Sequence, residues 1–190
     1  MYRHILTLFI SLLIYSLPAS AIEIEGVEIP ETDSPADSKT MLVLNGAGLR
    51  EKFFVDVYVG ALYLQAKTPD ARAILSDDGP ASVHMHILYS EISKKKITDG
   101  WIDGLDANLS KSEQQALQPR VDAFNKLFTV LKEGDVLRID YSPAKGTEVR
   151  INGEWRGAVE GNDFFRALLK IWIGSDPISK SLKQDMLGSD

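Results

Sequence analysis

The residue with the clearest chemistry in this sequence is Arg50, which follows a glycine-rich break directly. The break, residues 45–48, reads NGAG, and glycine lets a backbone approach a ligand closely because it carries no side chain. A guanidinium group keeps its charge, and its planar fork suits two parallel hydrogen bonds to a carboxylate or an enolate. We therefore predict that Arg50 binds an anionic group. The alternative is a surface arginine that pairs with Glu51 or Asp56.

Two further polar residues, Asp56 and Tyr58, interrupt the apolar run that follows, residues 53–64. The two-residue period of a β-strand places them on the same face, among apolar neighbours. A buried phenol needs a hydrogen-bond partner, and an oxygen atom of a ligand would serve. We predict that Asp56 and Tyr58 face the same cavity as Arg50. The alternative for Tyr58 is a core tyrosine that is bonded to backbone.

The remaining chemistry-bearing residues give weak signals. His84 and His86 share one strand face and could form half of a metal site, but two ligands alone make a weak site. The other histidine, His4, lies in the N-terminal segment discussed below, so we expect an exposed or partly buried pair and no metal. The sequence has no cysteine, which excludes disulfides and thiolate chemistry. No G-x-S-x-G, H-E-x-x-H, P-loop or dinucleotide motif occurs, so we expect no cofactor and assign no catalytic residue.

The stretch that must position these groups is residues 42–64. Its second half is rich in β-branched and aromatic residues and is apolar on both faces, so it should be a central strand covered on both sides. Further strands are expected at residues 22–30, 81–88, 135–141, 146–151 and 154–159, with a loop at 31–39. The pair Asn152-Gly153 predicts a tight hairpin between the last two.

Helical periodicity marks the other segments. The residues Ile97, Trp101 and Leu105 recur every four positions within 93–109, and the lysines at 94–96 should face solvent. A capping box at Ser110 opens a further helix, which Pro119 should divide or kink. Further helices are expected after a cap at Thr68, at residues 164–173 behind a cap at 162 or 163, and at 179–187. This order favours a single α+β domain, an antiparallel sheet with helices on one face.

The first 21 residues have the composition of a secretory signal peptide. A short basic start precedes an apolar core at residues 5–17 and an Ala-Ser-Ala site at 19–21. The apolar core is short for a bilayer span, although an uncleaved anchor is the alternative. The domain would then cover residues 22–190, in the periplasm or secreted, without stable membrane insertion. The net charge of −6 in 190 residues makes nucleic acid a poor partner.

Two motifs carry a resemblance to a known family. The run GAGLR at 46–50, followed by FFVDVYVGALYL at 53–64, resembles the signature of chalcone isomerase-like proteins. The run DFFRALLKIWIGSDPISKSLK at 163–183 is similar to the closing segment of that family, and residues 134–161 fit its short strands. The resemblance implies the chalcone isomerase-like open-faced β-sandwich, in which one layer of helices covers an antiparallel sheet.

The same resemblance implies roles for single residues. Arg50 matches an arginine that lines the ligand cleft in plant isomerases and in fatty-acid-binding relatives. Tyr58 falls where the isomerases carry threonine and the fatty-acid-binding relatives carry tyrosine, and Ile171 replaces a second threonine. Tyr89 is the candidate match for a tyrosine of the isomerases, whereas Asp99 lies near the place of their asparagine with the wrong spacing. Most of the polar network of the enzyme is therefore missing.

These observations lead to one hypothesis and two alternatives. We expect non-catalytic binding of a small amphipathic molecule such as a fatty acid, with Arg50, Tyr58, Asp56 and Tyr89 as the binding residues. The enzyme alternative is an isomerase or intramolecular lyase that acts on a chalcone-like or other enone substrate. The third reading is an interaction protein whose cleft is filled by its own side chains.

Overall fold

The structure, a computed structural model, describes residues 21–35 and 40–189. Apart from Ala21, the segment interpreted as a signal peptide lies outside these residues, so that interpretation stays a prediction. None of the helices in the described ranges is long and apolar enough to cross a membrane.

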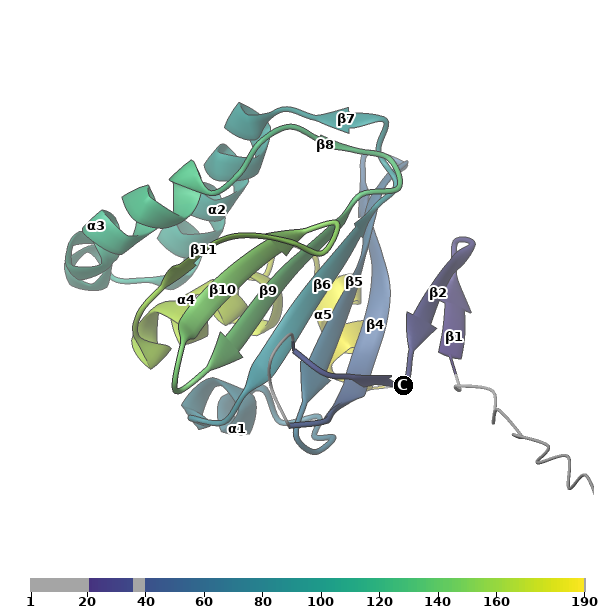
Figure 1. Cartoon of the computed structure of the whole chain (residues 1–190), viewed down its shortest axis with the longest axis horizontal. Helices are drawn as coiled ribbons and strands as arrows, with labels where there is room; N and C mark the ends of the chain where they lie inside the picture. The colour runs from purple at the N-terminus through teal and green to yellow at the C-terminus, as the bar shows by residue number, and fades with distance from the viewer. Residues whose placement is uncertain (1–20, 36–39, 190) are drawn as a thin grey trace, which may run out of the picture.

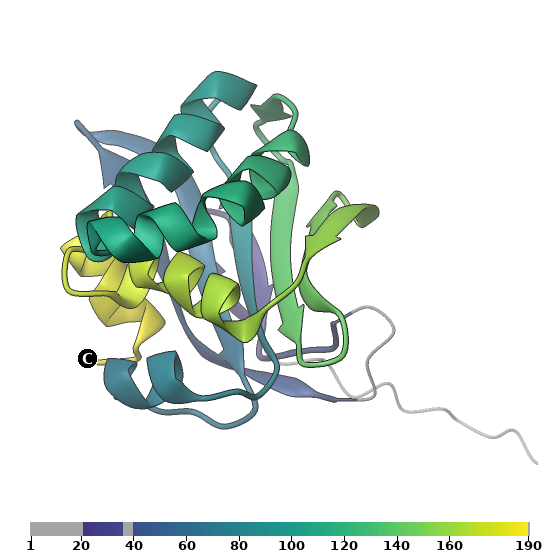
Figure 2. The same ribbon diagram turned by 90° about the vertical axis from the view of Figure 1, so that its left-hand side faces the viewer.

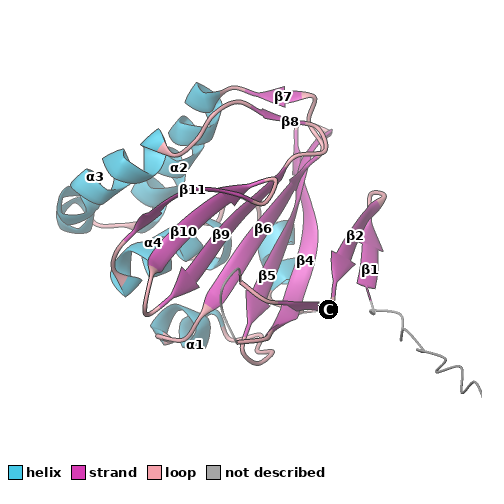
Figure 3. Cartoon of the chain, in the orientation of Figure 1, coloured by secondary structure: helices cyan, strands magenta, loops and turns pink. Residues whose placement is uncertain are grey.

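A seven-stranded sheet forms the centre of the molecule, and neighbouring strands are antiparallel throughout. The strand order is β11-β10-β9-β6-β5-β4-β3 (Figures 1 and 3). The strands are β3 (Thr32–Asp33), β4 (Leu42–Lys52), β5 (Val55–Leu64), β6 (Ala81–Ile87), β9 (Val136–Ser142), β10 (Gly146–Ile151) and β11 (Glu154–Val159). The strand that starts the candidate site, β5, is an interior strand, as its two apolar faces predict.

The helices cover one face of this sheet (Figure 2). They are α1 (Ala71–Ser76), α2 (Lys94–Asn108), α3 (Lys111–Lys126), α4 (Asn162–Ile173) and α5 (Lys180–Met186). The predicted apolar period of α2 is confirmed, since Ile97, Trp101 and Leu105 are its buried residues. Nine residues of α4 are buried, which makes this helix the centre of the core.

A second, smaller core lies on the opposite face of the sheet. There β1 (Ala21–Ile24) and β2 (Val27–Pro30) form a hairpin. Residue Ile29 packs in one cluster with Val59, Ala61 and Tyr63 of β5, whereas Tyr58 and Leu62 belong to the core under the helices. Both faces of β5 are therefore covered. The two remaining strands, β7 (Glu91–Ile92) and β8 (Leu131–Lys132), pair with each other outside the main sheet.

Two predicted strands are wrong in the same way, because each conceals a tight turn. Residues 22–30 are a hairpin in which Glu25 and Gly26 have positive φ values of 48° and 74°. Residues 53–64 begin with a second such turn, in which Phe53 and Phe54 have φ values of 52° and 63°. Apolar alternation continues across both turns and therefore hides them.

The glycine-rich break is not a break in the structure. Strand β4 runs through residues 45–48 with a register shift near Asn45, and α5 packs against it. A Cβ atom on Gly46 would lie 2.0 Å from the carbonyl oxygen of Asp185, and one on Gly48 would lie 2.2 Å from its carboxylate. These glycines thus allow α5 to pack closely against β4. The prediction that a ligand approaches this backbone is therefore wrong, because the helix occupies that place.

The predicted division of a helix at Pro119 and two predicted helix caps also fail. Pro119 lies inside one continuous helix, α3, which buries Leu117, Val121 and Phe124 and is held by the predicted capping box at Ser110. The short helix α1 is capped by Asp70 in place of Thr68. Helix α4 begins after Gly161 without a side-chain cap. For α1 and α4 the apolar pattern found the helix, and the cap residue was misplaced by one or two positions.

Candidate ligand-binding cavity

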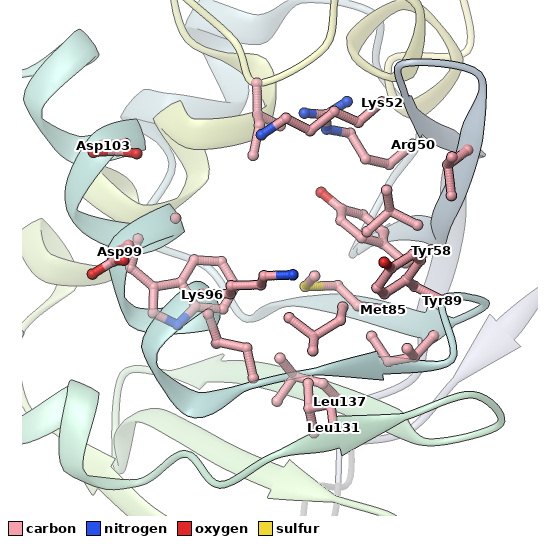
Figure 4. A pocket seen from close by; sticks show the side chains of 18 of the residues that line it. Arg50, Lys52, Tyr58, Met85, Tyr89, Lys96, Asp99, Asp103, Leu131 and Leu137 are labelled. Carbon is pink, nitrogen blue, oxygen red and sulfur yellow. The ribbon is translucent and has the colours of Figure 1, made fainter.

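A cavity of about 580 Å³ opens between the C-terminal ends of β4 and β6, the N-terminal end of β5 and the helix α2 (Figure 4). Most of its wall is apolar and includes Val55, Val57, Met85, Ile87, Ile92, Ile97, Leu131, Leu137 and Ile178. Its polar lining comprises Arg50, Lys52, Tyr58, Tyr89, Lys96, Asp99 and Asp103. The cavity therefore combines an apolar interior with charged groups from two opposite walls, the β4–β5 hairpin and α2.

A β-bulge decides which residues of β5 reach this cavity. Arg50 pairs with Tyr58, but the next residue of β4, Glu51, pairs with Asp56, so Val57 is an extra residue in β5. A bulge of this kind interrupts the alternation of side chains. Val55, Val57 and Tyr58 consequently line the cavity, and Asp56 does not. The prediction that Asp56 shares this cavity is wrong, because the two-residue period ends at the bulge.

Arg50 lies on β4 directly across from Tyr58, at one end of the cavity (Figure 4). The alternative of a pair with Glu51 or Asp56 is not what the structure has. The guanidinium Nη1 donates to the backbone carbonyl oxygen of Glu51, and within residues 21–35 and 40–189 it forms no ion pair with a carboxylate. Part of its hydrogen-bonding capacity therefore remains for a group in the cavity.

Tyr58 is a core residue with a polar tip at the cavity wall. Its side chain is 4% exposed, and its hydroxyl accepts a hydrogen bond of 3.0 Å from Nε1 of Trp172 on α4. The alternative of a core tyrosine bonded to backbone is therefore not what the structure has, since the partner is a side chain. Burial raises the pKa of Tyr58 to about 12, although the bond from Trp172 and the charge of Arg50 both act to lower it. The phenol stays neutral near pH 7 and keeps its proton to donate.

Tyr89 stands at the mouth, and Lys96 stands beside it. The ammonium nitrogen of Lys96 lies 5.7 Å from the centroid of the Tyr89 ring, within the range of a cation–π contact. Figure 4 shows the Lys96 side chain reaching into the middle of the cavity. The prediction of a solvent-facing lysine run is therefore incomplete, since Lys96 belongs to the site.

Sequence reasoning also missed Lys52 and Asp103 as lining residues. Lys96, Asp99 and Asp103 recur at intervals of three and four positions, which places them on one face of α2. That spacing was the available signal. Asp99 is held by Lys95, whose Nζ lies 2.6 Å from its carboxylate. Lys52 had no comparable signal, because its position depends on the turn at Phe53 and Phe54.

The histidine pair lies on the other face of the sheet, away from this cavity. His84 is 6% exposed and its Nε2 lies 3.3 Å from the carboxylate of Asp33. Asp33, His84 and Asp140 could each offer a metal ligand within 4.8 Å of one another. Arg138 already bridges the two carboxylates, at 2.8 Å from Asp33 and 3.2 Å from Asp140. This cluster is best explained as an ion network that ties β3 to β6 and β9.

The residue that the resemblance aligns with the second threonine of the isomerases is Ile171, which is apolar. Ile171 is fully buried and packs against Gly104 of α2, where an added Cβ would lie 2.8 Å from its side chain. Ile171 is not among the residues that line the cavity. The only hydroxyls on the described cavity wall come from Tyr58 and Tyr89.

Comparison with known proteins assigns this architecture to a family. The family model described as chalcone isomerase-like matches residues 21–188. The chain belongs to the chalcone isomerase-like family. This confirms the resemblance inferred from the two sequence motifs.

A sequence match and a structure match both lead to fatty-acid-binding protein 1 of Arabidopsis thaliana. Fatty-acid-binding protein 1 is 22% identical over 185 residues, which cover 81% of this chain and 64% of that protein, so the chain spans less than two thirds of this relative's length. The crystal structure of an Arabidopsis thaliana fatty-acid binding protein superposes with a TM-score of 0.68 at 16% identity, over 88% of this chain and 96% of that one. The α+β fold, a curled antiparallel sheet with helices on one face, is therefore confirmed.

Proposed function

We propose that this chalcone isomerase-like protein binds a small amphipathic anion, such as a fatty acid, without catalysing a reaction on it. The observation that carries the proposal is the mostly apolar cavity of about 580 Å³. Arg50 on β4 and Tyr58 on β5 pair with each other across the two strands at one end of it. Its volume falls in the usual range for small-molecule sites, roughly 300–1,000 Å³. An apolar tail would fill the interior, and an anionic head would lie near the arginine.

Two different hydrogen bonds would hold the head group. Arg50 offers a charge-assisted bond, a type that contributes about 1.5–3 kcal/mol. Tyr58 accepts from Trp172 and therefore has one proton left to donate toward the same carboxylate. Lys52 and Lys96 add positive charge along the wall. The Arabidopsis protein that matches in both sequence and structure is named as a fatty-acid-binding protein, which supports a fatty acid as the ligand class.

The enzyme alternative receives less support from the same geometry. Cyclisation of a chalcone needs a stabilised enolate and a positioned phenolate. The phenol of Tyr58 has a pKa of about 12, which makes it a poor base near pH 7. Ile171 supplies no polar group. The reading of a cleft filled by its own side chains is disfavoured by the open volume.

The composition of residues 1–21 supports a periplasmic or secreted site of action. We propose that cleavage follows Ala21. Edman sequencing of the exported protein should then begin at Ile22. A sequence that begins at Met1 would contradict this proposal without affecting the proposed ligand.

Extraction of bound molecules tests the binding function itself. Protein purified without detergent from its own host would be denatured, and the released small molecules identified by mass spectrometry. We expect carboxylated amphiphiles in near-stoichiometric amount. Protein that releases none, and that also takes up none after incubation with dodecanoate, would contradict the proposal.

A further inference from the structure

The tip of the β4–β5 hairpin exposes two aromatic side chains to solvent. Phe53 is 85% exposed and Phe54 is 96% exposed, and Val55 beside them is 44% exposed. Figure 2 shows this hairpin projecting past the layer of helices. Neither phenylalanine belongs to either core cluster. Packing in the interior of the protein therefore does not explain why two phenylalanines occupy this tip.

The backbone of the turn makes the choice of residues more unusual. The two other described turns with a pair of positive φ angles use Glu25-Gly26 and Asn152-Gly153, and each contains the glycine that such turns favour. Phe53 and Phe54 adopt the same left-handed region without a glycine. A bulky residue in this conformation costs on the order of 1 kcal/mol. The turn thus accepts both strain and exposed apolar area, a combination that folding alone does not favour.

The tip is continuous with the mouth of the cavity. Lys52 and Phe53 line the cavity, and the Lys52 ammonium lies 5.8 Å from the Phe53 ring. Phe54 is the outermost residue and does not line the cavity. A surface that binds the tip would therefore lie next to the opening through which a ligand must pass.

The size and charge of the tip indicate what kind of surface binds it. Two phenylalanines bury roughly 150–250 Å² each, whereas a stable protein interface needs roughly 800 Å² from each partner. Insertion into a bilayer needs no such area, because apolar side chains enter the acyl layer while a lysine stem extends to the head groups. The nearest charges, Arg50 and Lys52 against Glu51 and Asp56, balance, so anionic lipids should add little.

We propose that the β4–β5 hairpin tip docks the protein on the surface of a phospholipid bilayer, with Phe53 and Phe54 inserted and the cavity mouth facing the lipid. The use of this docking for ligand exchange rests on the proposed function. The docking itself does not, since it requires no ligand in the cavity.

Vesicle flotation tests the docking with a variant that spares the cavity. Phe54→Gly removes the outermost ring and places in the turn the residue that its positive φ favours. Trp155→Thr is the matched control, because Trp155 is another exposed aromatic residue, 57% exposed, on the edge strand β11. We expect wild-type protein to float with phosphatidylcholine vesicles, Phe54→Gly to bind at least fivefold more weakly, and Trp155→Thr to bind normally.

Three outcomes would overturn the proposal. They are no flotation of the wild type, equal flotation of Phe54→Gly, and binding that appears only with 30% phosphatidylglycerol and survives Phe54→Gly. Calorimetry with dodecanoate in the absence of vesicles tests the proposed ligand binding independently of the proposed docking. Phe54→Gly should bind dodecanoate as the wild type does. A wild-type protein that binds vesicles but no dodecanoate would refute the proposed ligand-binding function and leave the docking proposal standing.

Discussion

The indole nitrogen of Trp172 on α4 donates a hydrogen bond of 3.0 Å to the phenol oxygen of Tyr58 on β5. Both side chains are almost completely buried, at 1% and 4% exposure. Because the oxygen already accepts from the indole, the proton of Tyr58 is the part of the group that remains for the cavity. A core helix thus fixes the orientation of the one buried hydroxyl on the described cavity wall, next to the guanidinium of Arg50.

Replacement of Arg50 should weaken binding of carboxylated ligands selectively. Loss of a charge-assisted hydrogen bond of about 1.5–3 kcal/mol corresponds to roughly ten- to a hundredfold in affinity, so Arg50→Ala should lose that much in calorimetry with dodecanoate. Arg50→Lys should recover only part of it, because lysine lacks the planar fork. If Arg50 were structural, Arg50→Ala would lower the melting temperature without any preference between anionic and neutral ligands.

Tyr58→Phe should affect stability more than the mutation of an ordinary ligand contact. Removal of the hydroxyl leaves the buried Nε1 of Trp172 without its acceptor, at a cost of about 1–3 kcal/mol in the free energy of unfolding. Urea denaturation measures this change. Tyr89→Phe is the control, since Tyr89 is 36% exposed at the mouth and should stay within about 0.5 kcal/mol of the wild type. Equal stability of both variants would show that the Trp172 bond contributes nothing.

His86 should make the protein less stable as the pH falls through mildly acidic values. Burial, with a smaller contribution from the neighbouring His84, lowers the pKa of His86 from 6.5 to about 4. Between these two values the unfolded chain binds a proton that the folded chain does not, so stability declines as pH falls from about 6.5 to about 4. His86→Gln should flatten this part of the pH profile of unfolding by urea. An unchanged slope would refute the role of His86.

Catalysis on a chalcone should be absent. Tyr58 and Ile171 stand where the isomerases that this chain resembles carry threonine, and Ile171 is fully buried outside the cavity wall. A steady-state absorbance assay should give the spontaneous rate of cyclisation with and without protein. Turnover well above that rate, lost in Arg50→Ala, would favour the enzyme alternative over simple binding.

The periodicity of the sequence predicted most of the architecture. The two apolar faces of residues 53–64 indicated an interior strand, which the structure has at 55–64. The four-residue spacing of Ile97, Trp101 and Leu105 indicated the buried face of α2, as the structure has it. Both signals are local, because an element buried on a given face repeats its apolar residues at a fixed interval. The family motifs at 46–64 and 163–183 then indicated the fold that these elements form.

The parts of the site that could not be predicted depend on how segments pair and pack against one another. The bulge at Val57, which removes Asp56 from the cavity, arises from the pairing of β5 with β4. The glycines before Arg50 leave room for α5, a helix far along the chain, to pack against β4. The bond between Tyr58 and Trp172 joins residues 114 positions apart. A single sequence carries the residues of such contacts without indicating which of them meet.

The account depends most directly on a preference for a charged head group. Calorimetry of the wild-type protein with dodecanoate and with 1-dodecanol, below the concentrations at which either aggregates, compares two ligands that share one chain length. If Arg50 binds the carboxylate, dodecanoate should bind at least tenfold more tightly, a difference of about 1.4 kcal/mol, and Arg50→Ala should abolish the difference. Equal affinity for the acid and the alcohol in the wild-type protein would contradict the account.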